Sequence, residues 1–275
     1  MERINLNDLQ KRKLNRCYVS WVIITKEIYI RNNDSCREKK LLYIILGTNI
    51  SGNRQVVASL FEDKFNNRFW LEYLEGIKNR GAEFVLFAVI PPNRNLERCL
   101  KIVYTNIHII HSPEEIITDV TKFFTEKSTR KFITNLKDLF FAKTLDDHNI
   151  EVEMFKEQFS NNKIVLMLLD RNENEIKKFY AYSYEIRKFL YPYYPIRELK
   201  RELNKLNNLE KLASNLSEIN TFFLPLINKY ESRRSYYRAE WLELLNTIYT
   251  DYETELEEYL KWKKKWLKMR RLTIK

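Results

Sequence analysis

Apolar and polar residues alternate over much of the first third of the chain, which is typical of β-strands. The alternation predicts three strands, over Tyr18 to Ile30, Leu41 to Ile50 and Val56 to Phe61. Between the last two lies Ser51-Gly52-Asn53, which has the composition of a hairpin turn. We therefore expect the chain to begin with three strands joined by antiparallel hairpin connections.

A helical period follows these strands. Trp70, Leu74 and Ile77 fall on one face of a helix that we expect to begin near Asn66, with Gly81 as its C-terminal cap. A second, shorter helix is expected a little further on, again with its apolar residues on one side. Those residues are Leu96, Leu100 and Val103.

Two further strands are expected on either side of the second helix. The run from Phe84 to Ile90 is apolar throughout, as in strands buried on both faces, and Pro91-Pro92 ends it. A second apolar stretch covers Ile107 to Ile110. The predicted order is β-β-β-α-β-α-β, with hairpins before strands that are linked by helices and run parallel. This is the strand order of the ribonuclease H-like fold, and few other mixed sheets share it.

Beyond Ile110 the pattern is helical. Ser112-Pro113-Glu114-Glu115 is a capping box with proline at the first helical position, a strong helix start. A stripe of leucines and isoleucines from Leu199 to Ile219 is interpreted as core or as a contact with a partner. The expected helices cover roughly residues 113–126, 128–142, 146–160 and 163–190, then one from Ile196 and one from about Ser232.

These elements predict an α/β protein: a ribonuclease H-like mixed sheet with a helical insertion and long C-terminal helices. The expected parts are a basic N-terminal segment (1–16), the ribonuclease H-like core (17–111), the helical insertion (112–192), C-terminal helices that complete the core (193–260) and a basic tail rich in tryptophan and lysine (261–275).

Positive charge is concentrated at the two ends of the chain. The formal net charge is +11; residues 261–275 hold eight Lys or Arg and no acid, which gives +8. Residues 1–16 hold five Lys or Arg against two acids, which gives +3 and leaves the rest of the chain close to neutral. Basic ends on a neutral body favour contact with a polyanion through those ends.

Composition excludes several other classes of function. The four glycines all lie between Gly47 and Gly81, with a spacing that fits no phosphate-binding loop, so no nucleotide-hydrolysing P-loop is expected. The three cysteines have no metal-ligand spacing, and His108 and His111 are interpreted as structural histidines, so we expect no metal and no cofactor. Because no apolar run reaches membrane-spanning length and no signal peptide is recognisable, we expect a cytoplasmic protein.

Two stretches carry a recognisable motif. The first, between about Lys40 and Leu100, contains KKLLYIILGTNISGNRQVVAS and RFWLEYLEGIKNRGAEFVLFAVI, and the second is AYSYEIRKFLY at 181–191. Both resemble the catalytic domain of Mutator-type insertion-sequence transposases. The features that the first stretch has in common with that family are a Phe-Trp pair, spaced leucines and Lys-x-Arg-Gly before a hydrophobic strand. Those positions here are Phe69, Trp70, Leu71, Leu74, Ile77, Lys78, Arg80 and Gly81.

The resemblance implies a site in which three carboxylates hold two Mg²⁺ ions for phosphoryl transfer. The first family aspartate falls here on Ile24 or Thr25, and the second on Ile90. The third acid, a glutamate, falls on Arg197. The resemblance therefore implies a degenerate site without its acidic triad.

Neighbouring acids do not replace the missing triad in the sequence. No Asp or Glu occurs between Glu83 and Glu97, so the second position has no substitute nearby. Glu27 lies in the first strand, and Glu198 is one residue from the third position. Whether either of these two retains a role with metal stays open.

We expect a domesticated, catalytically inactive transposase-like protein that binds duplex DNA with weak sequence specificity, associates with the nucleoid and forms a homo-oligomer. Alternatives are a protein-interaction scaffold without DNA binding and a divergent metal-dependent nuclease or transposase. For the tail, packing of its tryptophans onto the core or a second subunit stays open, as does lying on an acidic membrane surface. The expected DNA contacts are Lys11, Arg12, Lys13, Arg233, Arg234, Arg238, Lys261, Lys263, Lys264, Lys265, Lys268, Arg270 and Arg271.

Overall fold

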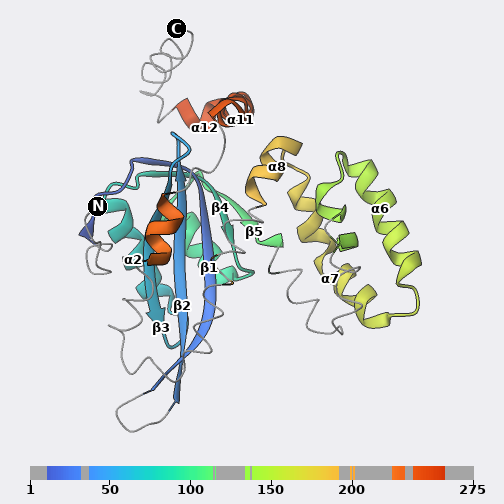
Figure 1. The fold of residues 1–275 in the computed structure, drawn as a ribbon, viewed down its shortest axis with the longest axis horizontal. Coiled ribbons are helices and arrows are strands. Elements are labelled where there is room, and N and C mark those ends of the chain that lie inside the picture. The colour runs from blue at the N-terminus through green and yellow to red at the C-terminus, as the bar shows by residue number, and fades with distance from the viewer. Residues whose placement is uncertain are drawn as a thin grey trace.

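A computed structural model describes most of the chain (Figure 1). The described residues are 11–31, 37–113, 115, 134–136, 138–191, 199, 201, 225–232 and 238–257.

A five-stranded mixed sheet forms the centre of the protein (Figure 1). Its order is β3-β2-β1-β4-β5, with β1 antiparallel to β2, β2 antiparallel to β3, and β4 parallel to both β1 and β5. This confirms the predicted mixed sheet with ribonuclease H-like order. The strands are β1 (Cys17–Arg31), β2 (Arg37–Asn49), β3 (Arg54–Glu62), β4 (Phe84–Ile90) and β5 (His108–His111).

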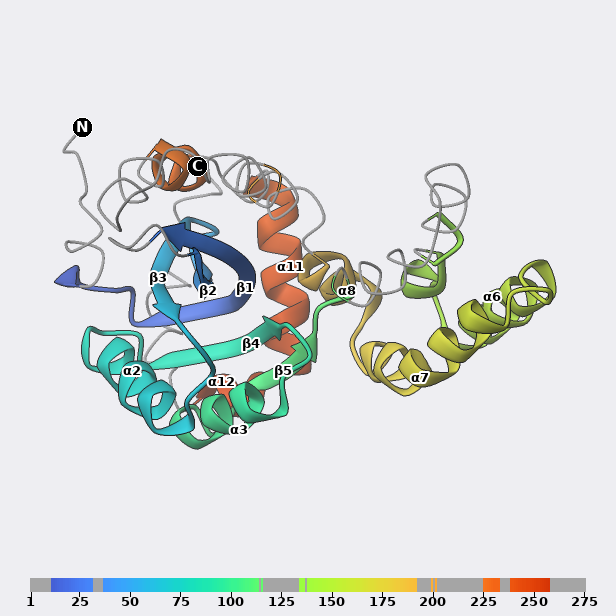
Figure 2. The same cartoon turned by 90° about the horizontal axis from the view of Figure 1, so that it is seen from below.

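Helices lie on both faces of the sheet and to one side of it (Figure 2). The helices α2 (Asn67–Asn79) and α3 (Arg94–Val103) cover one face, and α8 (Tyr184–Leu190) and α11 (Arg238–Asp251) cover the other. The remaining labelled helices are α6 (Leu145–Gln158), α7 (Lys163–Phe179) and α12 (Glu253–Glu257). None of the helices within the described ranges is long and apolar enough to span a bilayer.

The core divides between the two faces of the sheet. On the first face, Trp70 and Leu74 of α2 pack against strand residues such as Trp21 and Tyr43. On the second face, α11 packs against β1 and β4. Leu199 and Ile227 pack against residues of β2 and β3 on the same face. Every residue of β4 is buried, as its continuous apolar run predicts.

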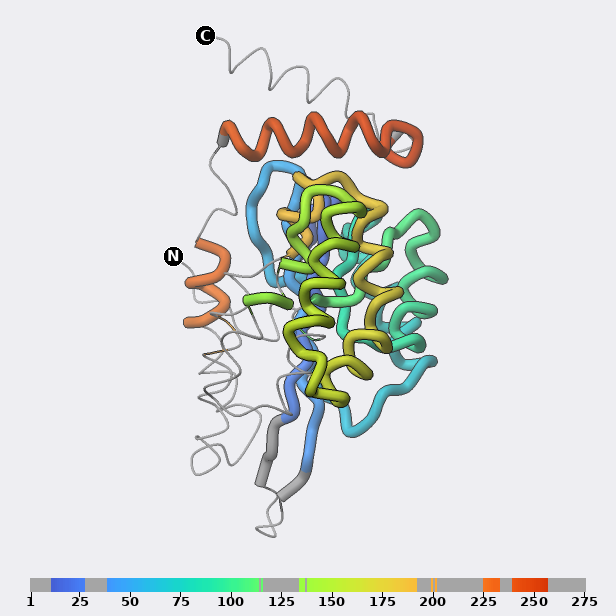
Figure 3. Tube along the Cα trace, turned by 90° about the vertical axis from the view of Figure 1, so that its right-hand side faces the viewer, coloured from blue at the N-terminus to red at the C-terminus, as the bar shows by residue number. Residues whose placement is uncertain are grey.

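The turn between β2 and β3 anchors α11, which crosses one end of the sheet (Figure 3). Gly52 has φ of 76°, a conformation that favours glycine, and the ring of Trp241 packs directly against it. The indole Nε1 of Trp241 donates a hydrogen bond of 2.8 Å to the carbonyl oxygen of Ile50. A residue with a side chain at position 52 would therefore be strained and would also collide with this indole.

The prediction of one helix over residues 163–190 is wrong in one respect. The structure has two helices there, because α7 ends at Phe179 and α8 begins at Tyr184. The break turns Tyr182 toward the sheet, where its ring meets Phe87 of β4 edge-on at 5.8 Å. Tyr180 itself donates a hydrogen bond from its hydroxyl to the carbonyl oxygen of Leu139.

A buried arginine joins α8 to the preceding helical residues. Arg187 is 2% exposed, and its guanidinium donates hydrogen bonds to the carbonyl oxygens of Phe140, Ala142 and Lys143 at 3.2, 2.9 and 2.7 Å. The same group lies 4.2 Å from the ring centroid of Tyr180. These contacts satisfy carbonyls that the end of residues 138–141, a helical turn, leaves without intrahelical partners.

Several expected elements lie outside the described residues. These include the basic segments 1–10 and 261–275, most of 113–133, and the leucine stripe beyond Leu199. The expected last helix is described from Arg238 onward, and the proposed boundaries of the insertion and of the C-terminal helices stay predictions.

Substitutions at two glycines, one in β2 and one in α2, test the packing around β2. A Cβ at Gly47 in β2 would lie 2.6 Å from ring carbons of Tyr18 and 2.8 Å from Val57 Cγ2, so Gly47→Ala should lower the free energy of unfolding by about 1–3 kcal/mol. Gly76→Ala in α2 has open space around it and should raise the free energy of unfolding by about 0.5–1 kcal/mol. Urea denaturation measures both. Equal effects of the two substitutions would contradict the packing described for β2.

Candidate functional site

The positions that the family resemblance assigns to catalytic acids lie on neighbouring parallel strands. The parallel pairing of β1 with β4 ends at Val22 opposite Val89, one residue before Ile90. Ile90 ends β4 and pairs with His111 of β5. Ile24 and Thr25 follow Val22 by two and three residues on β1. The first and second positions thus lie on adjacent inner strands of the sheet, with Ile90 at the end of β4 and Ile24 and Thr25 in the middle of β1.

The side chains at these positions belong to the apolar core. Ile90 is fully buried in the cluster that includes Ile23 and Leu96. Ile24 is 2% exposed and packs on the opposite face, in the cluster that includes Ile227. Thr25 is partly buried. Arg197, the third position, lies outside the described residues, as does Glu198.

This donor set does not fit the magnesium ions that the resemblance implies. Mg²⁺ requires several oxygen ligands in near-octahedral geometry, and isoleucine supplies none. Among the residues that the structure describes, no group of three or more His, Cys, Asp or Glu has a geometry that could hold a metal ion. Glu27, the acid nearest in sequence to Thr25, is 55% exposed and pairs with Lys39 at 2.6 Å. No step of metal-assisted chemistry is therefore derived for these positions.

A charged cluster lies beside Ile90 instead. His111, the pairing partner of Ile90, places Nδ1 2.8 Å from Glu175 Oε2 of α7 and Nε2 3.5 Å from Glu97 Oε2 of α3. Lys178 pairs with Glu175 at 2.7 Å. The cluster joins α3, β5 and α7, so it links the sheet edge to the helical insertion.

Lysines pair with both carboxylates of the cluster. Lys101 lies 2.6 Å from Glu97, and although burial opposes ionisation, the hydrogen bond and charge of Lys101 bring the pKa of the Glu97 carboxyl below its ordinary value. With Glu175 also paired, neither acid is arranged as a pair of open metal ligands. The contacts of His111 instead join β5 to α3 and α7.

His108 lies three residues before His111 on β5, and it contacts residues at the C-terminal end of the described chain. Its Nε2 lies 3.8 Å from Glu255 of α12, and its ring meets Tyr252 edge-on at 4.8 Å. Burial lowers the pKa of His108, against an opposing effect of Glu255. The histidine therefore contributes mainly by packing α12 against the edge of the sheet.

Sequence reasoning did not single out Glu97 or Glu175. His111 directly follows the strand predicted over Ile107 to Ile110, but its partners come from helices that are far apart in the chain. The sequence gives one weak indication for Glu97, because it is the first acidic residue after the stretch without Asp or Glu that follows Glu83. It gives none for Glu175, because the place of Glu175 depends on how α7 packs.

Of the predicted DNA contacts, few are described. Lys11 and Lys13 are exposed. Arg12 is 19% exposed, and its guanidinium pairs with Glu231 at 2.5 Å and also donates to the carbonyl oxygen of Val56. Arg12 therefore ties the N-terminal segment to β3 and to the helical residues 225–231. Arg233, Arg234, the side chain of Arg238 and the whole tail 261–275 lie outside the described residues.

Comparison with known proteins gives one family. Its model, described as the Mutator family of transposases, matches residues 3–215, which include the whole sheet and the described helices up to α8. The chain belongs to the Mutator family of transposases. This confirms the resemblance read from the motifs around Trp70 and Gly81.

Related Mutator-family proteins are named transposases of bacterial insertion sequences. The chain is 21% identical over 241 residues to the transposase of ISRM3 from Rhizobium meliloti and 19% identical over 235 residues to the transposase of IS905 from Lactococcus lactis. These alignments cover 86% and 84% of this chain but only 60% and 59% of the relatives. The chain thus spans about three fifths of the length of these relatives.

Among solved structures, the chain matches the Drosophila P element transposase strand transfer complex. The sequence identity is 11% and the TM-score 0.30, over 92% of this chain and 71% of that one. Since this score is low, the assignment of the fold stands on the strand order and pairing described above.

The core position of Ile90 gives a direct test of the site. Ile90→Asp should lower the free energy of unfolding by several kcal/mol, because it buries a carboxylate without a partner. Ile90→Val, the control, should cost about 1 kcal/mol. Urea denaturation at neutral pH measures both. If Ile90→Asp were as stable as Ile90→Val, the edge of the sheet would already accommodate a carboxylate, and the description of a closed apolar site would be wrong.

Proposed function

We propose that this Mutator-family protein binds duplex DNA and does not cut it. The observation that carries the proposal is the burial of Ile90 in the apolar core, at the position where the family resemblance expects the second acid, together with buried Ile24 or partly buried Thr25 at the position of the first. Two-metal phosphoryl transfer needs carboxylate oxygens at those points, and these side chains have none.

DNA as the partner is supported by family and by charge. The relatives are named transposases of insertion sequences, and this chain carries +8 in its last fifteen residues. Lysines contact phosphates without reading bases, so the binding should be strongly salt-dependent and weakly specific. The protein would then act in an architectural or regulatory role, or as an inactive partner within a nucleoid-associated complex, and we include homo-oligomer formation in the proposal.

Binding is tested by fluorescence polarisation with a short labelled duplex at several salt concentrations. Lys263→Ala/Lys264→Ala/Lys265→Ala should weaken binding and reduce the slope of log K against log salt by roughly 2–3, because each lost phosphate contact removes about one released counterion. The control Lys143→Ala/Lys163→Ala/Arg171→Ala also removes three charges, from exposed positions on the helical insertion, and should leave the slope unchanged. Absence of binding to any nucleic acid at low salt would overturn the proposal.

Cleavage is tested separately with supercoiled plasmid and Mg²⁺ or Mn²⁺. We expect the plasmid to remain intact, since the aliphatic positions supply no metal ligands. The same assay is run with Glu27→Gln, Glu97→Gln, Glu175→Gln and Glu198→Gln. Metal-dependent nicking that any of these substitutions abolishes would establish a rearranged nuclease site and contradict the proposed inactivity. Nicking that is equal in all the proteins would identify a contaminant and leave the expected result in place.

A further inference from the structure

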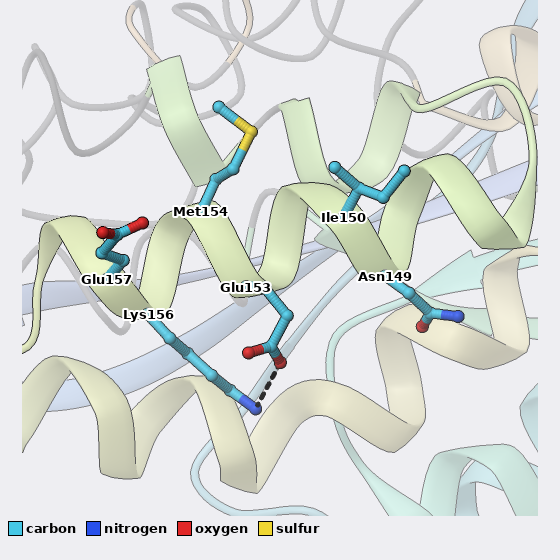
Figure 4. Close-up of a pocket in the computed structure, with 6 residues that line it drawn as sticks. All are labelled: Asn149, Ile150, Glu153, Met154, Lys156 and Glu157. Atoms are coloured by element: carbon cyan, nitrogen blue, oxygen red, sulfur yellow. Dashed lines mark ion pairs between the residues drawn. The ribbon is translucent and has the colours of Figure 1, made fainter.

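The hairpin of α6 and α7 lies to one side of the sheet, with α8 between it and the core (Figures 1 and 2). One face of α6 is buried through His148, Val152 and Phe155. On the opposite face, Ile150 and Met154 are 60% and 58% exposed. These two side chains are one helical turn apart and point to the same side of α6 (Figure 4). Such a pair of large apolar side chains in water suggests a contact surface.

The exposed side of α6 is also acidic. The helix carries Asp146, Asp147, Glu151, Glu153 and Glu157 against the single Lys156, a formal charge of −4 with His148 neutral. Lys156 lies 3.8 Å from Glu153, an i,i+3 pair that neutralises only part of this charge (Figure 4). We call this surface the α6 face; it contains a shallow open pocket. The pocket is lined by Asn149, Ile150, Glu153, Met154, Lys156 and Glu157.

A partner for the α6 face must combine positive charge with large apolar side chains. This chain contains a segment of that composition. Residues 261–275 carry eight Lys or Arg and no acid, with Trp262 and Trp266 four positions apart in the sequence. Indole rings supply large apolar area, and the lysines between them match the carboxylates of the α6 face.

We propose that the α6 face binds residues 261–275 of a second copy of this chain. Glu257 ends α12, three residues before this segment begins. Figures 1 and 2 both place α12 and α6 on opposite sides of α8. The inference rests on the homo-oligomer part of the proposed function, and it gives that oligomer a defined contact.

One consequence concerns DNA. The same lysines would bind either phosphates or the carboxylates of α6, so duplex DNA and the second copy compete for the tail. Adding short duplex DNA should therefore shift the protein toward monomer.

The test is sedimentation velocity of the full-length protein over a range of concentrations. Glu153→Lys/Glu157→Lys should weaken self-association by about tenfold or more, because it reverses two charges beside Ile150 and Met154. The control Glu240→Lys/Glu243→Lys makes the same charge change at exposed positions of α11 and should leave self-association unchanged. Met154→Ser tests the apolar part and should weaken self-association without changing charge.

A mixing experiment decides whether the tail acts between copies. Lys264→Glu/Lys265→Glu should also lose self-association, and mixing it with Glu153→Lys/Glu157→Lys should restore a complex. In the mixture, the basic tail of one variant meets an acidic α6 face, and the reversed charges of the other pair also match. A wild-type protein that stays monomeric, or self-association that is unaffected by the α6 substitutions, would overturn the inference.

Failure of this inference can be told apart from failure of the proposed function. The α6 variants keep the whole tail, so they should bind duplex DNA in polarisation as tightly as the wild type, or more tightly. Loss of DNA binding in the wild type with self-association intact would remove the proposed function only. Intact DNA binding without self-association would remove the α6 contact only.

Discussion

Burial of β4 on both faces is the constraint on which the rest of the structure depends. All seven of its residues are buried, with α2 and α3 on one side and α8 and α11 on the other. A strand in this position must be apolar to its last residue, since any unpaired charge there would cost several kcal/mol. Ile90 meets this requirement. A carboxylate at the same point would have to be stabilised by cations or metal, and the lysines of the cluster beside Ile90, Lys101 and Lys178, are already paired with Glu97 and Glu175.

The central sheet could be predicted because each strand carries its own signal. The alternation in β1 to β3, the uniform run in β4 and the prolines after it are local properties of the sequence. The family could also be predicted from sequence, through motifs such as those around Trp70 and Gly81. These features require little knowledge of how distant segments pack.

Contacts between distant segments could not be predicted. The cluster of Glu97, His111 and Glu175 depends on the packing of α7 against the sheet edge, and the pair of Arg12 with Glu231 joins residues 219 positions apart. Arg12 was expected to contact DNA from its place in a basic segment, yet its guanidinium is used inside the fold. The break at Tyr180 was missed for the same reason, because it depends on Phe87 and Leu139 rather than on residues next to it.

The hydrogen bonds of Arg187 have a consequence for how the chain folds. The carbonyl groups that it satisfies precede it by 47, 45 and 44 residues, so residues 138–143 cannot complete their hydrogen bonding until α8 has been synthesised and released from the ribosome. The hairpin of α6 and α7 lies within that interval, so the hydrogen bonds of Arg187 join the two ends of the segment that contains the hairpin.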